Sequence, residues 1–430
     1  MPIPTPTPTP TATPIPPITT PLPTPTQAPP FKLSFQEIKL ESPHKGFTDF
    51  KFIPGTKNEF LVLEQEGRVT QYRLEDDTAQ RIGYFQVENV VSSTECGLLT
   101  LAFDPDFQTN HFLYLGYCPD LPTLFEGENI VRTQNDQFFR IGRFVFDPAG
   151  YESGKTVEGM DIITVGDLLA PFPVPQHTGG AMGFEPDGTM WAFFGERLAR
   201  EVAQDWNDLR GSMVRIIPNR DPGGSGYTPA NGNLFLNAPA KSPIVYAKGF
   251  RNPWRALLDS KGRYWVADPG EAVAEEIDVV TRAGQNFGWP YYQGPCFIDL
   301  REAAFCRPFT DPIRYWDHTF EYPFFVEDPE AIRTPARVAW VGMEYLDKGN
   351  DRYGGQMTNR VTYGEMCVGW VRAIQVSDLG QILEDRFIGH LPGITSWDQE
   401  PDGYMYAASY GTCEYDRPQV GRLYRAVPEQ

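Results

Sequence analysis

The sequence has little basic charge, few histidines and no long apolar run. Of its 430 residues, 37 are Lys or Arg and 56 are Asp or Glu, which gives a net charge of −19, and five are histidine. This acidic balance excludes nucleic acid and anionic membrane surfaces as natural partners. No apolar run approaches the ~20 residues of a membrane-spanning helix, so we expect no transmembrane segment. The composition, 41% hydrophobic and 13% aromatic, is that of a globular protein.

The first 31 residues lack charged side chains altogether. Thirteen of the 41 prolines lie before residue 31, in alternation with threonine. Such a segment favours extended, solvated polyproline II, so we expect a disordered linker over 1–31 and one folded domain over 32–430. A stalk of an exported protein and an ordinary tail both fit this composition. We expect the stalk, in an extracellular, cell-surface or periplasmic protein. No charged region followed by an apolar one precedes it, so the expected signal or anchor is absent from this sequence.

Cysteine is scarce, and no CxxC pair occurs, which argues against a zinc knuckle or a thioredoxin-like motif. The six cysteines are Cys96, Cys118, Cys296, Cys306, Cys367 and Cys413. An even number favours disulfides, although buried thiols are the alternative. Cys296 and Cys306 flank one loop, and a bond between them would stabilise the fold by roughly 3 kcal/mol in the chain-entropy model. We therefore predict a Cys296–Cys306 disulfide.

One local pattern recurs along the chain: a short alternating apolar segment, a polar turn with Pro, Asp or Gly, and a second aromatic-rich segment. It is found in residues 50–74, 98–117, 180–195, 254–268, 340–361 and 397–411. Helical periodicity is sparse, and residues 198–211 predict only a short turn or two. Because each repeat predicts a β-hairpin, we expect an all-β fold, a six-bladed β-propeller of four-stranded antiparallel blades.

Five segments, in this order, resemble the soluble glucose/sorbosone dehydrogenase family, which includes hedgehog-interacting-protein-like members. They are ECGLLTLAFDPDF from Glu95, HTGG from His177 with the following EPDG, GFRNPWR at 249–255, DPGEAVAEEID at 268–278 and GQNFGWPYYQG at 284–294. The resemblance implies a propeller that uses pyrroloquinoline quinone (PQQ) and Ca²⁺. It also implies an oxidoreductase that converts an aldose sugar to a lactone at its anomeric carbon.

The resemblance assigns roles to four residues. His177 would be the general base that takes the proton of the anomeric hydroxyl; a merely structural histidine is the alternative. Arg251 and Asn252 would face the cofactor, and the permanent charge of Arg251 suits the negative charge that develops on a quinone oxygen. Glu95 falls among the cofactor-binding positions and adds a negative charge there. We expect Arg255, in the same motif, to make a structural pairing instead.

The acidic segment at 268–278 would supply metal ligands, because Ca²⁺ prefers oxygen donors that include backbone carbonyls. By position in the family motif, the carbonyls of Gly270 and Glu271 would hold the cofactor's Ca²⁺. The Glu276 side chain and the Phe287 carbonyl align with a second, structural Ca²⁺ site. A solvated acidic run is the alternative.

The chain also departs from the family at three positions. Gly393, Thr395 and Met366 lie where the resemblance places two arginines and a lysine that neutralise PQQ. Losing charge-assisted hydrogen bonds, each contributing roughly 1.5 to 3 kcal/mol, would weaken binding of this tricarboxylate by orders of magnitude. We therefore expect a replacement cation, first of all Arg337 or Arg360.

Three functions remain open at this point. The first is a sugar dehydrogenase with a remodelled cofactor pocket and an unidentified electron acceptor. The second is a non-catalytic propeller that has lost PQQ anchoring and binds a carbohydrate or a protein. A calcium-dependent lactone or ester hydrolase is the third. The exposed side of a propeller would also permit a homodimer.

Overall fold

The computed structural model describes most of the chain that follows the Pro/Thr segment. The described residues are 31–41, 45–120, 124–126, 129–132, 137–167, 176–238, 241–295, 308–318, 337–411 and 419–429. Residues 32–430 form one compact unit, separate from the unit of residues 1–31. The predicted linker lies outside the described residues, except for Phe31. Among the described residues, no helix has the length and apolarity needed to cross a membrane.

Helices are nearly absent from the described part of the chain, as the sparse helical periodicity predicted. They are α1 (Phe107–Asn110) and the 3₁₀-helix η1 (Arg200–Gln204). α1 ends at His111, whose φ of 55° is left-handed. η1 lies within 198–211, where the sequence predicted only a short turn. The described fold is therefore all-β.

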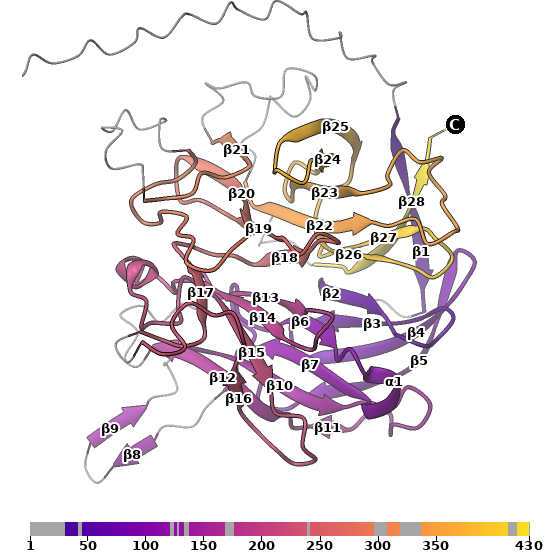
Figure 1. Cartoon of the computed structure of the whole chain (residues 1–430). Helices are drawn as coiled ribbons and strands as arrows, with labels where there is room; N and C mark the ends of the chain where they lie inside the picture. The colour runs from indigo at the N-terminus through magenta and orange to yellow at the C-terminus, as the bar shows by residue number, and fades with distance from the viewer. Residues whose placement is uncertain are drawn as a thin grey trace, which may run out of the picture. The chain divides into compact units, whose positions relative to one another are not determined.

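The strands pair mainly in antiparallel groups of four (Figure 1). The first group is β2 (Phe47–Phe52), β3 (Glu59–Glu64), β4 (Arg68–Glu75) and β5 (Thr78–Val87). The second is β6 (Leu98–Phe103), β7 (Phe112–Tyr117), β10 (Gln137–Val145) and β12 (Met160–Asp167). The third is β13 (Gly179–Phe184), β14 (Met190–Phe194) and β15 (Ser212–Pro218), with β16 (Tyr227–Pro229) and β17 (Val245–Lys248) both pairing with β15.

The second half of the chain repeats this arrangement. The fourth group is β18 (Arg255–Leu258), β19 (Tyr264–Asp268), β20 (Ala274–Val280) and β21 (Arg314–Asp317). The fifth is β22 (Ala339–Tyr345), β23 (Arg360–Glu365), β24 (Trp370–Val376) and β25 (Ile382–His390). The sixth is β26 (Ile394–Gln399), β27 (Met405–Ser409), β28 (Arg422–Pro428) and the N-terminal β1 (Leu33–Leu40). Three short strands stand apart, β8 (Leu124–Glu126), β9 (Asn129–Arg132) and β11 (Thr156–Val157).

Each predicted hairpin is an antiparallel strand pair in the structure. The pairs are β2–β3, β6–β7, β13–β14, β18–β19, β22–β23 and β26–β27. Their turns hold the residues that the sequence pattern used. Gly188 in the β13–β14 turn, for example, has φ of 88°, which is strained for other residues. Local turn chemistry therefore determined this level of the fold.

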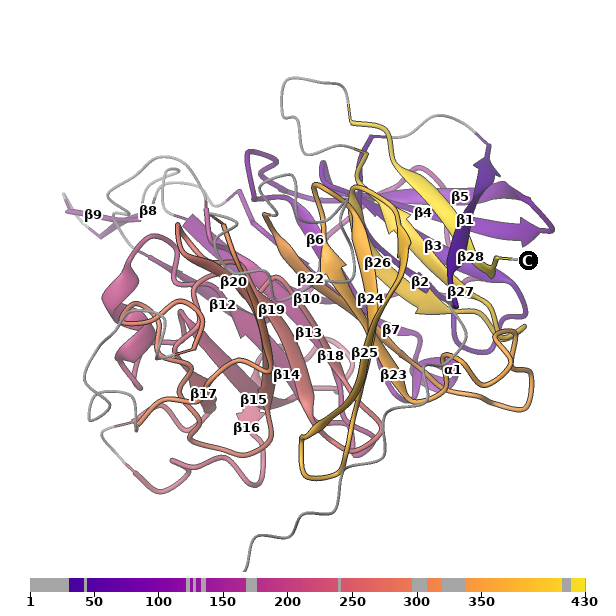
Figure 2. The ribbon, with the colours of Figure 1, turned by 90° about the horizontal axis from the view of Figure 1, so that it is seen from above.

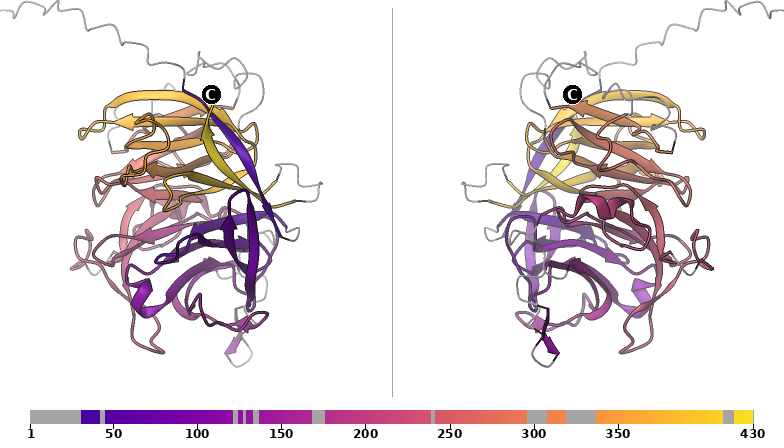
Figure 3. Two further views of the ribbon diagram at one scale, coloured as in Figure 1. Left: turned by 90° about the vertical axis from the view of Figure 1, so that its right-hand side faces the viewer. Right: turned by 90° about the vertical axis from the view of Figure 1, so that its left-hand side faces the viewer.

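The two ends of the folded unit share one sheet. β1 pairs antiparallel with β28, with Ser34 opposite Val427 and Ile38 opposite Leu423 (Figure 3). β1 also pairs briefly in parallel with β5, so the first and sixth groups form a nine-stranded sheet together with β11. This pairing joins the N-terminal strand to the C-terminal hairpin.

The first strands of the six groups lie next to one another in cyclic order. Contacts run from β2 to β6, β13, β18, β22, β26 and back to β2 (Figure 1). Seen from above, the β22–β25 sheet lies between β18–β20 and β26–β28 (Figure 2). Two residues from each of these six first strands line one cavity of about 40 Å³. The first strands thus surround a narrow axial cavity.

Apolar side chains fill the space between neighbouring groups. Tyr114 of β7, Met190 of β14 and Val214 of β15 are fully buried in one such cluster. Trp265 of β19 and Tyr363 of β23 are fully buried in another. Each fully buried large side chain stabilises the fold by about 1.5 to 3 kcal/mol. This packing holds the loops at the strand starts in fixed positions.

One disulfide, missed in the sequence analysis, joins Cys96, before β6, to Cys118, after β7. Cys367 is also disulfide-bonded. The predicted Cys296–Cys306 bond lies outside the described residues.

Candidate functional site

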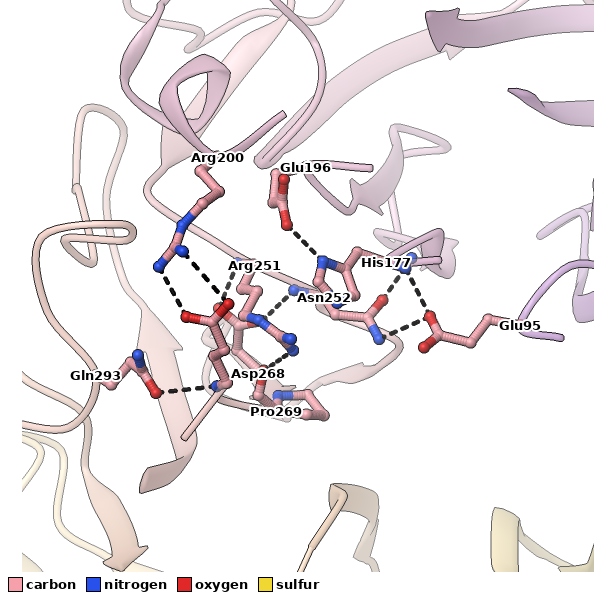
Figure 4. A network of polar contacts seen from close by, with 11 residues as sticks. Glu95, His177, Glu196, Arg200, Arg251, Asn252, Asp268, Pro269 and Gln293 are labelled. Atoms are coloured by element: carbon pink, nitrogen blue, oxygen red, sulfur yellow. Dashed lines mark hydrogen bonds and ion pairs between the residues drawn. The ribbon is translucent and has the colours of Figure 1, made fainter. Parts of the chain in front are cut away.

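His177 lies in the loop before β13, in a left-handed conformation with φ of 50°. Its backbone amide donates a hydrogen bond to Glu95 Oε2 at 2.6 Å. Its Nδ1 is hydrogen-bonded to Oε1 of Glu196 (Figure 4). Since a carboxylate only accepts, Nδ1 carries the proton, and in the neutral ring Nε2 keeps its lone pair. The imidazole is thus in the tautomer that a general base requires.

Glu196 was missed in the sequence analysis. It follows β14 in the segment FFGERL and is 0% exposed. Its backbone amide donates to the Arg251 carbonyl at 2.9 Å, which fixes the carboxylate beside His177. The sequence signal was weak: an acidic residue directly after an apolar strand. The contact between His177 and Glu196 joins residues 19 positions apart. It forms because the β13–β14 hairpin brings its two ends together, which the local sequence pattern does not show.

Asn252 and Glu95 tie three loops together. The Asn252 Oδ1 accepts a hydrogen bond from the Gly179 amide at 2.9 Å, and its Nδ2 donates to Glu95 Oε2 at 3.3 Å. Only glycine fits at Gly179, because a Cβ there would lie 2.5 Å from the Gly195 nitrogen. Glu95 therefore binds the loops before β13 and β18 with a single carboxylate oxygen.

Arg251 directly precedes Asn252 in the loop before β18. Its Nη1 donates to the Pro269 carbonyl at 3.0 Å, and its guanidinium lies 5.5 Å from the Trp289 ring centroid. The buried Nε has no hydrogen-bond partner among the described residues. Asp268 accepts from the backbone amides of Arg251 at 2.8 Å and Asn252 at 2.6 Å. Burial raises the pKa of the Asp268 carboxyl to about 7.

The predicted calcium loop adjoins Arg251. The Glu271 side chain forms an ion pair with Arg200 at 2.8 Å, and its amide donates to Gln293 Oε1 at 2.9 Å (Figure 4). Within the described ranges, nothing donates a hydrogen bond to the carbonyl oxygens of Gly270 or Glu271. Both carbonyls therefore keep their lone pairs for another partner.

Glu276 lies in a group of buried acids on β19 and β20. It faces Asp268 across the two strands and accepts a hydrogen bond from the Gly294 amide. Asp278, two residues on, is 0% exposed, and neither carboxyl oxygen has a partner among the described residues. Burial and the neighbouring carboxyls raise the pKa of both Glu276 and Asp278. Phe287 is buried 11 positions after Glu276, and its amide donates to the Lys248 carbonyl.

Side chains alone do not form a metal site in the described part of the chain. No group of three or more imidazole, thiol or carboxyl side chains there is placed to hold an ion. A Ca²⁺ site would therefore have to include backbone carbonyls, as the resemblance implies for Gly270, Glu271 and Phe287.

The residues at the three positions where the chain departs from the family provide no cation. Gly393 has φ of 78°, and a Cβ there would lie 2.7 Å from the Gly411 oxygen, so a side chain would be strained. Thr395 is buried, and its hydroxyl donates to the Phe47 carbonyl at 2.7 Å. Met366 exchanges backbone hydrogen bonds with Val338 and Gly393, and its thioether carries no charge.

Neither arginine predicted as a replacement cation contacts the residues of the candidate site among the hydrogen bonds and ion pairs of the described residues. Arg360 forms an ion pair with Glu384 of β25. It pairs with Tyr345, at the end of the β22–β23 ladder away from Met366, so that expectation was wrong. Arg337 lies just before β22 with an exposed side chain, and its amide donates to Glu365.

Arg255 instead occupies the axial cavity. It lines that cavity from β18 and donates to the carbonyls of Thr48 and Thr395, on β2 and β26. Its pairing is structural, as predicted, but with backbone carbonyls and not with a surface acid.

Comparisons with known proteins agree with the motifs. Residues 42–323 match the family model described as Glucose / Sorbosone dehydrogenase. Aldose sugar dehydrogenase YliI of Escherichia coli is 27% identical over 74% of this chain and 76% of its own length. HIPL1 protein of Arabidopsis thaliana is 29% identical over 35% of this chain. The matched region spans only 23% of the length of HIPL1.

A solved structure supports the fold. The PQQ-bound aldose sugar dehydrogenase of Streptomyces coelicolor has a TM-score of 0.61 and 19% identity, and covers 93% of this chain and 100% of its own. At this identity, the similarity is one of fold. Together with the family match over 42–323, it shows that the chain belongs to the Glucose / Sorbosone dehydrogenase family.

Proposed function

We propose that the protein oxidises an aldose sugar at its anomeric carbon to a lactone, with PQQ and Ca²⁺. The observation that carries this proposal is the convergence of His177, Glu196, Arg251, Asn252 and Glu95 in one hydrogen-bonded network. Base, cation and amide come from separate loops, and packing alone does not require them to meet.

His177 would act on the sugar. Oxidation removes one proton from the anomeric hydroxyl and one hydride from the anomeric carbon. Nε2 of His177 is the proton acceptor, because Nδ1 is committed to Glu196. Glu196 stabilises the imidazolium that forms and keeps the ring oriented, so it is a positioning residue.

PQQ, when bound, would accept the hydride. The residues on one side of the site fit this group. Arg251 has a buried Nε with no partner among the described residues, and a guanidinium suits an anionic quinone. Asn252 is held in place by Gly179 and Glu95, so it presents a fixed amide.

Ca²⁺ would be held by the carbonyls of Gly270 and Glu271, which accept no hydrogen bond from a described residue. Glu276 and the Phe287 carbonyl are our candidates for the second site. The buried Asp278 carboxyl has no partner among the described residues, and a nearby cation would stabilise its ionised form, which favours such a site.

A second candidate function is a non-catalytic binding protein. It is favoured by Gly393, Thr395 and Met366, which offer PQQ no charge-assisted hydrogen bond. In that case the network around His177 would recognise an uncharged carbohydrate or a protein.

We also infer that the six groups of strands are the blades of a six-bladed propeller. The cyclic contacts of their first strands and the shared axial cavity support this count. We propose further that residues 1–31 form a flexible linker of an exported protein; the Cys96–Cys118 disulfide is consistent with an oxidising compartment.

Reconstitution tests the proposal. Purified protein with Ca²⁺ and PQQ should reduce a dye in the presence of at least one sugar of an aldose panel. Calorimetry should show PQQ binding in the micromolar range or tighter. Absence of binding in that range would reject the dehydrogenase proposal in favour of the binding protein.

A further inference from the structure

A fully buried lysine lies three positions before Arg251 in the chain. Lys248, the last residue of β17, is 0% exposed. Its ammonium group donates to the carbonyl oxygens of Val202 at 2.9 Å, Asp208 at 3.0 Å and Arg210 at 2.7 Å. An ammonium group has three donors and no acceptor, so these three carbonyls use it completely.

The three carbonyls belong to one segment, residues 196–211, which connects β14 to β15. This segment begins with Glu196, the partner of His177, and includes Arg200, the partner of Glu271. It therefore carries two of the residues that orient the site.

The segment has little regular structure of its own. Its only helix is η1, five residues long and without a side-chain hydrogen bond at its N-cap. Such a short 3₁₀-helix is weakly stable in isolation. Backbone bonds also tie it to the residues that follow β17, from the Gly249 amide to the Ala203 carbonyl at 3.1 Å and from the Phe250 amide to the Gly211 carbonyl at 3.3 Å. The Gln204 side chain adds hydrogen bonds to Asn286 and to the Trp289 carbonyl.

Lys248 thus joins the segment to the strand that leads into Arg251. An apolar side chain of similar size would leave the carbonyls of Asp208 and Arg210 without their donor, while that of Val202 would keep only the Asp205 amide. The segment would have to shift for these carbonyls to reach water. A shift of this kind would move Glu196 relative to His177.

We propose that Lys248 is a positioning residue that holds segment 196–211 so that Glu196 meets His177 and Arg200 meets Glu271. The catalytic part of this inference rests on the proposed function. Lys248 itself touches neither substrate nor cofactor.

The first experiment compares the wild type with Lys248→Met, and uses Lys155→Met, an exposed lysine paired with Glu152, as control. We expect kcat for the aldose to fall by about tenfold or more in Lys248→Met, with KM changed by less, because a misplaced base slows the chemical step. Lys155→Met should match the wild type. A kcat within twofold of wild type in Lys248→Met would overturn the proposal.

The second experiment uses Lys248→Ala with added n-propylammonium or 1-propanol. We expect the ammonium ion to raise the activity of Lys248→Ala several-fold and the alcohol to leave it unchanged. The three carbonyls need the three N–H donors of an ammonium group. Equal restoration by both would show that the site needs only a filled cavity, and failure of both variants to fold would assign Lys248 to the fold as a whole. Either result overturns the positioning role.

Hydrogen exchange separates this inference from the proposed function. Even if the wild type oxidises no aldose, amides of 197–211 should exchange faster in Lys248→Met than in the wild type, while those of β3 and β4 should not change. An unchanged rate in 197–211 would contradict the role of Lys248, whatever the activity.

Discussion

The Nδ1 atom of His177 is hydrogen-bonded to the carboxylate of Glu196, which is itself completely buried. The pair leaves Nε2 as the only basic nitrogen of the ring.

Replacing Glu196 by Gln should therefore impair the chemical step. The amide no longer stabilises the imidazolium or selects one tautomer, and loss of such a partner typically costs 10- to 100-fold. We expect kcat to fall by about this factor while PQQ affinity stays near that of the wild type. Glu201→Gln, an exposed neighbour in η1, serves as control. Equal steady-state kinetics for both variants would show that Glu196 has no part in catalysis.

Arg255→Met should destabilise the fold. The Arg255 side chain connects β18 to β2 and β26 across the axial cavity, and burial lowers its pKa. Its charge also faces the buried Asp49, which would keep hydrogen bonds from Phe50, Leu101 and Ser396 but lose its facing cation, at a cost of about 3 kcal/mol.

The double variant Arg255→Met/Asp49→Asn should recover part of that loss, because the unpaired charge is gone. Denaturant unfolding measures both variants. If Arg255→Met unfolds at the wild-type midpoint, the guanidinium does not connect the first strands.

Glu400 should make stability depend on pH. It is 6% exposed, and burial together with Asp402 raises its pKa to about 8. Because the folded state binds the proton more tightly than the unfolded state, this group's contribution to stability is complete below about pH 4.5 and is lost as the pH rises through 8. Thermal unfolding of Glu400→Gln should vary less between pH 5 and 8 than that of the wild type. Parallel curves for the two proteins would be the contrary result.

Removing the Cys96–Cys118 bond should cost about 3 kcal/mol in the chain-entropy model, for a sequence separation of 22. Denaturant unfolding of the double variant Cys96→Ala/Cys118→Ala and of the wild type measures this difference in the free energy of unfolding. Mass spectrometry of unreduced peptides should show this bond and our predicted Cys296–Cys306 bond. Free thiols at Cys296 and Cys306 in protein made under oxidising conditions would reject the second prediction.

The fold was predictable where it depends on local chemistry. Turn residues and alternating apolar positions identified six hairpins, each of which is a strand pair in the structure. Pairing of β1 with β28 was not in the local pattern, because it joins segments almost 400 residues apart.

The site was predictable where a motif names the residue, as for His177, Arg251 and Asn252. Glu196 and Lys248 were missed because their roles depend on contacts between loops and on burial. The choice of Arg360 as a replacement cation was wrong because strand pairing places it opposite Tyr345, at the end of β23 away from Met366, where it pairs with Glu384. Arg255 extends from β18 into the axial cavity instead.

Turnover of aldoses by the wild type and by His177→Ala, each loaded with Ca²⁺ and PQQ, tests the central claim most directly. We predict dye reduction by the wild type and a decrease of about 10²-fold or more in His177→Ala, with PQQ affinity nearly unchanged, as expected for loss of a general base. Equal turnover by the two proteins, or none by a wild type that binds PQQ, would contradict the assignment of His177 as the base of a sugar dehydrogenase.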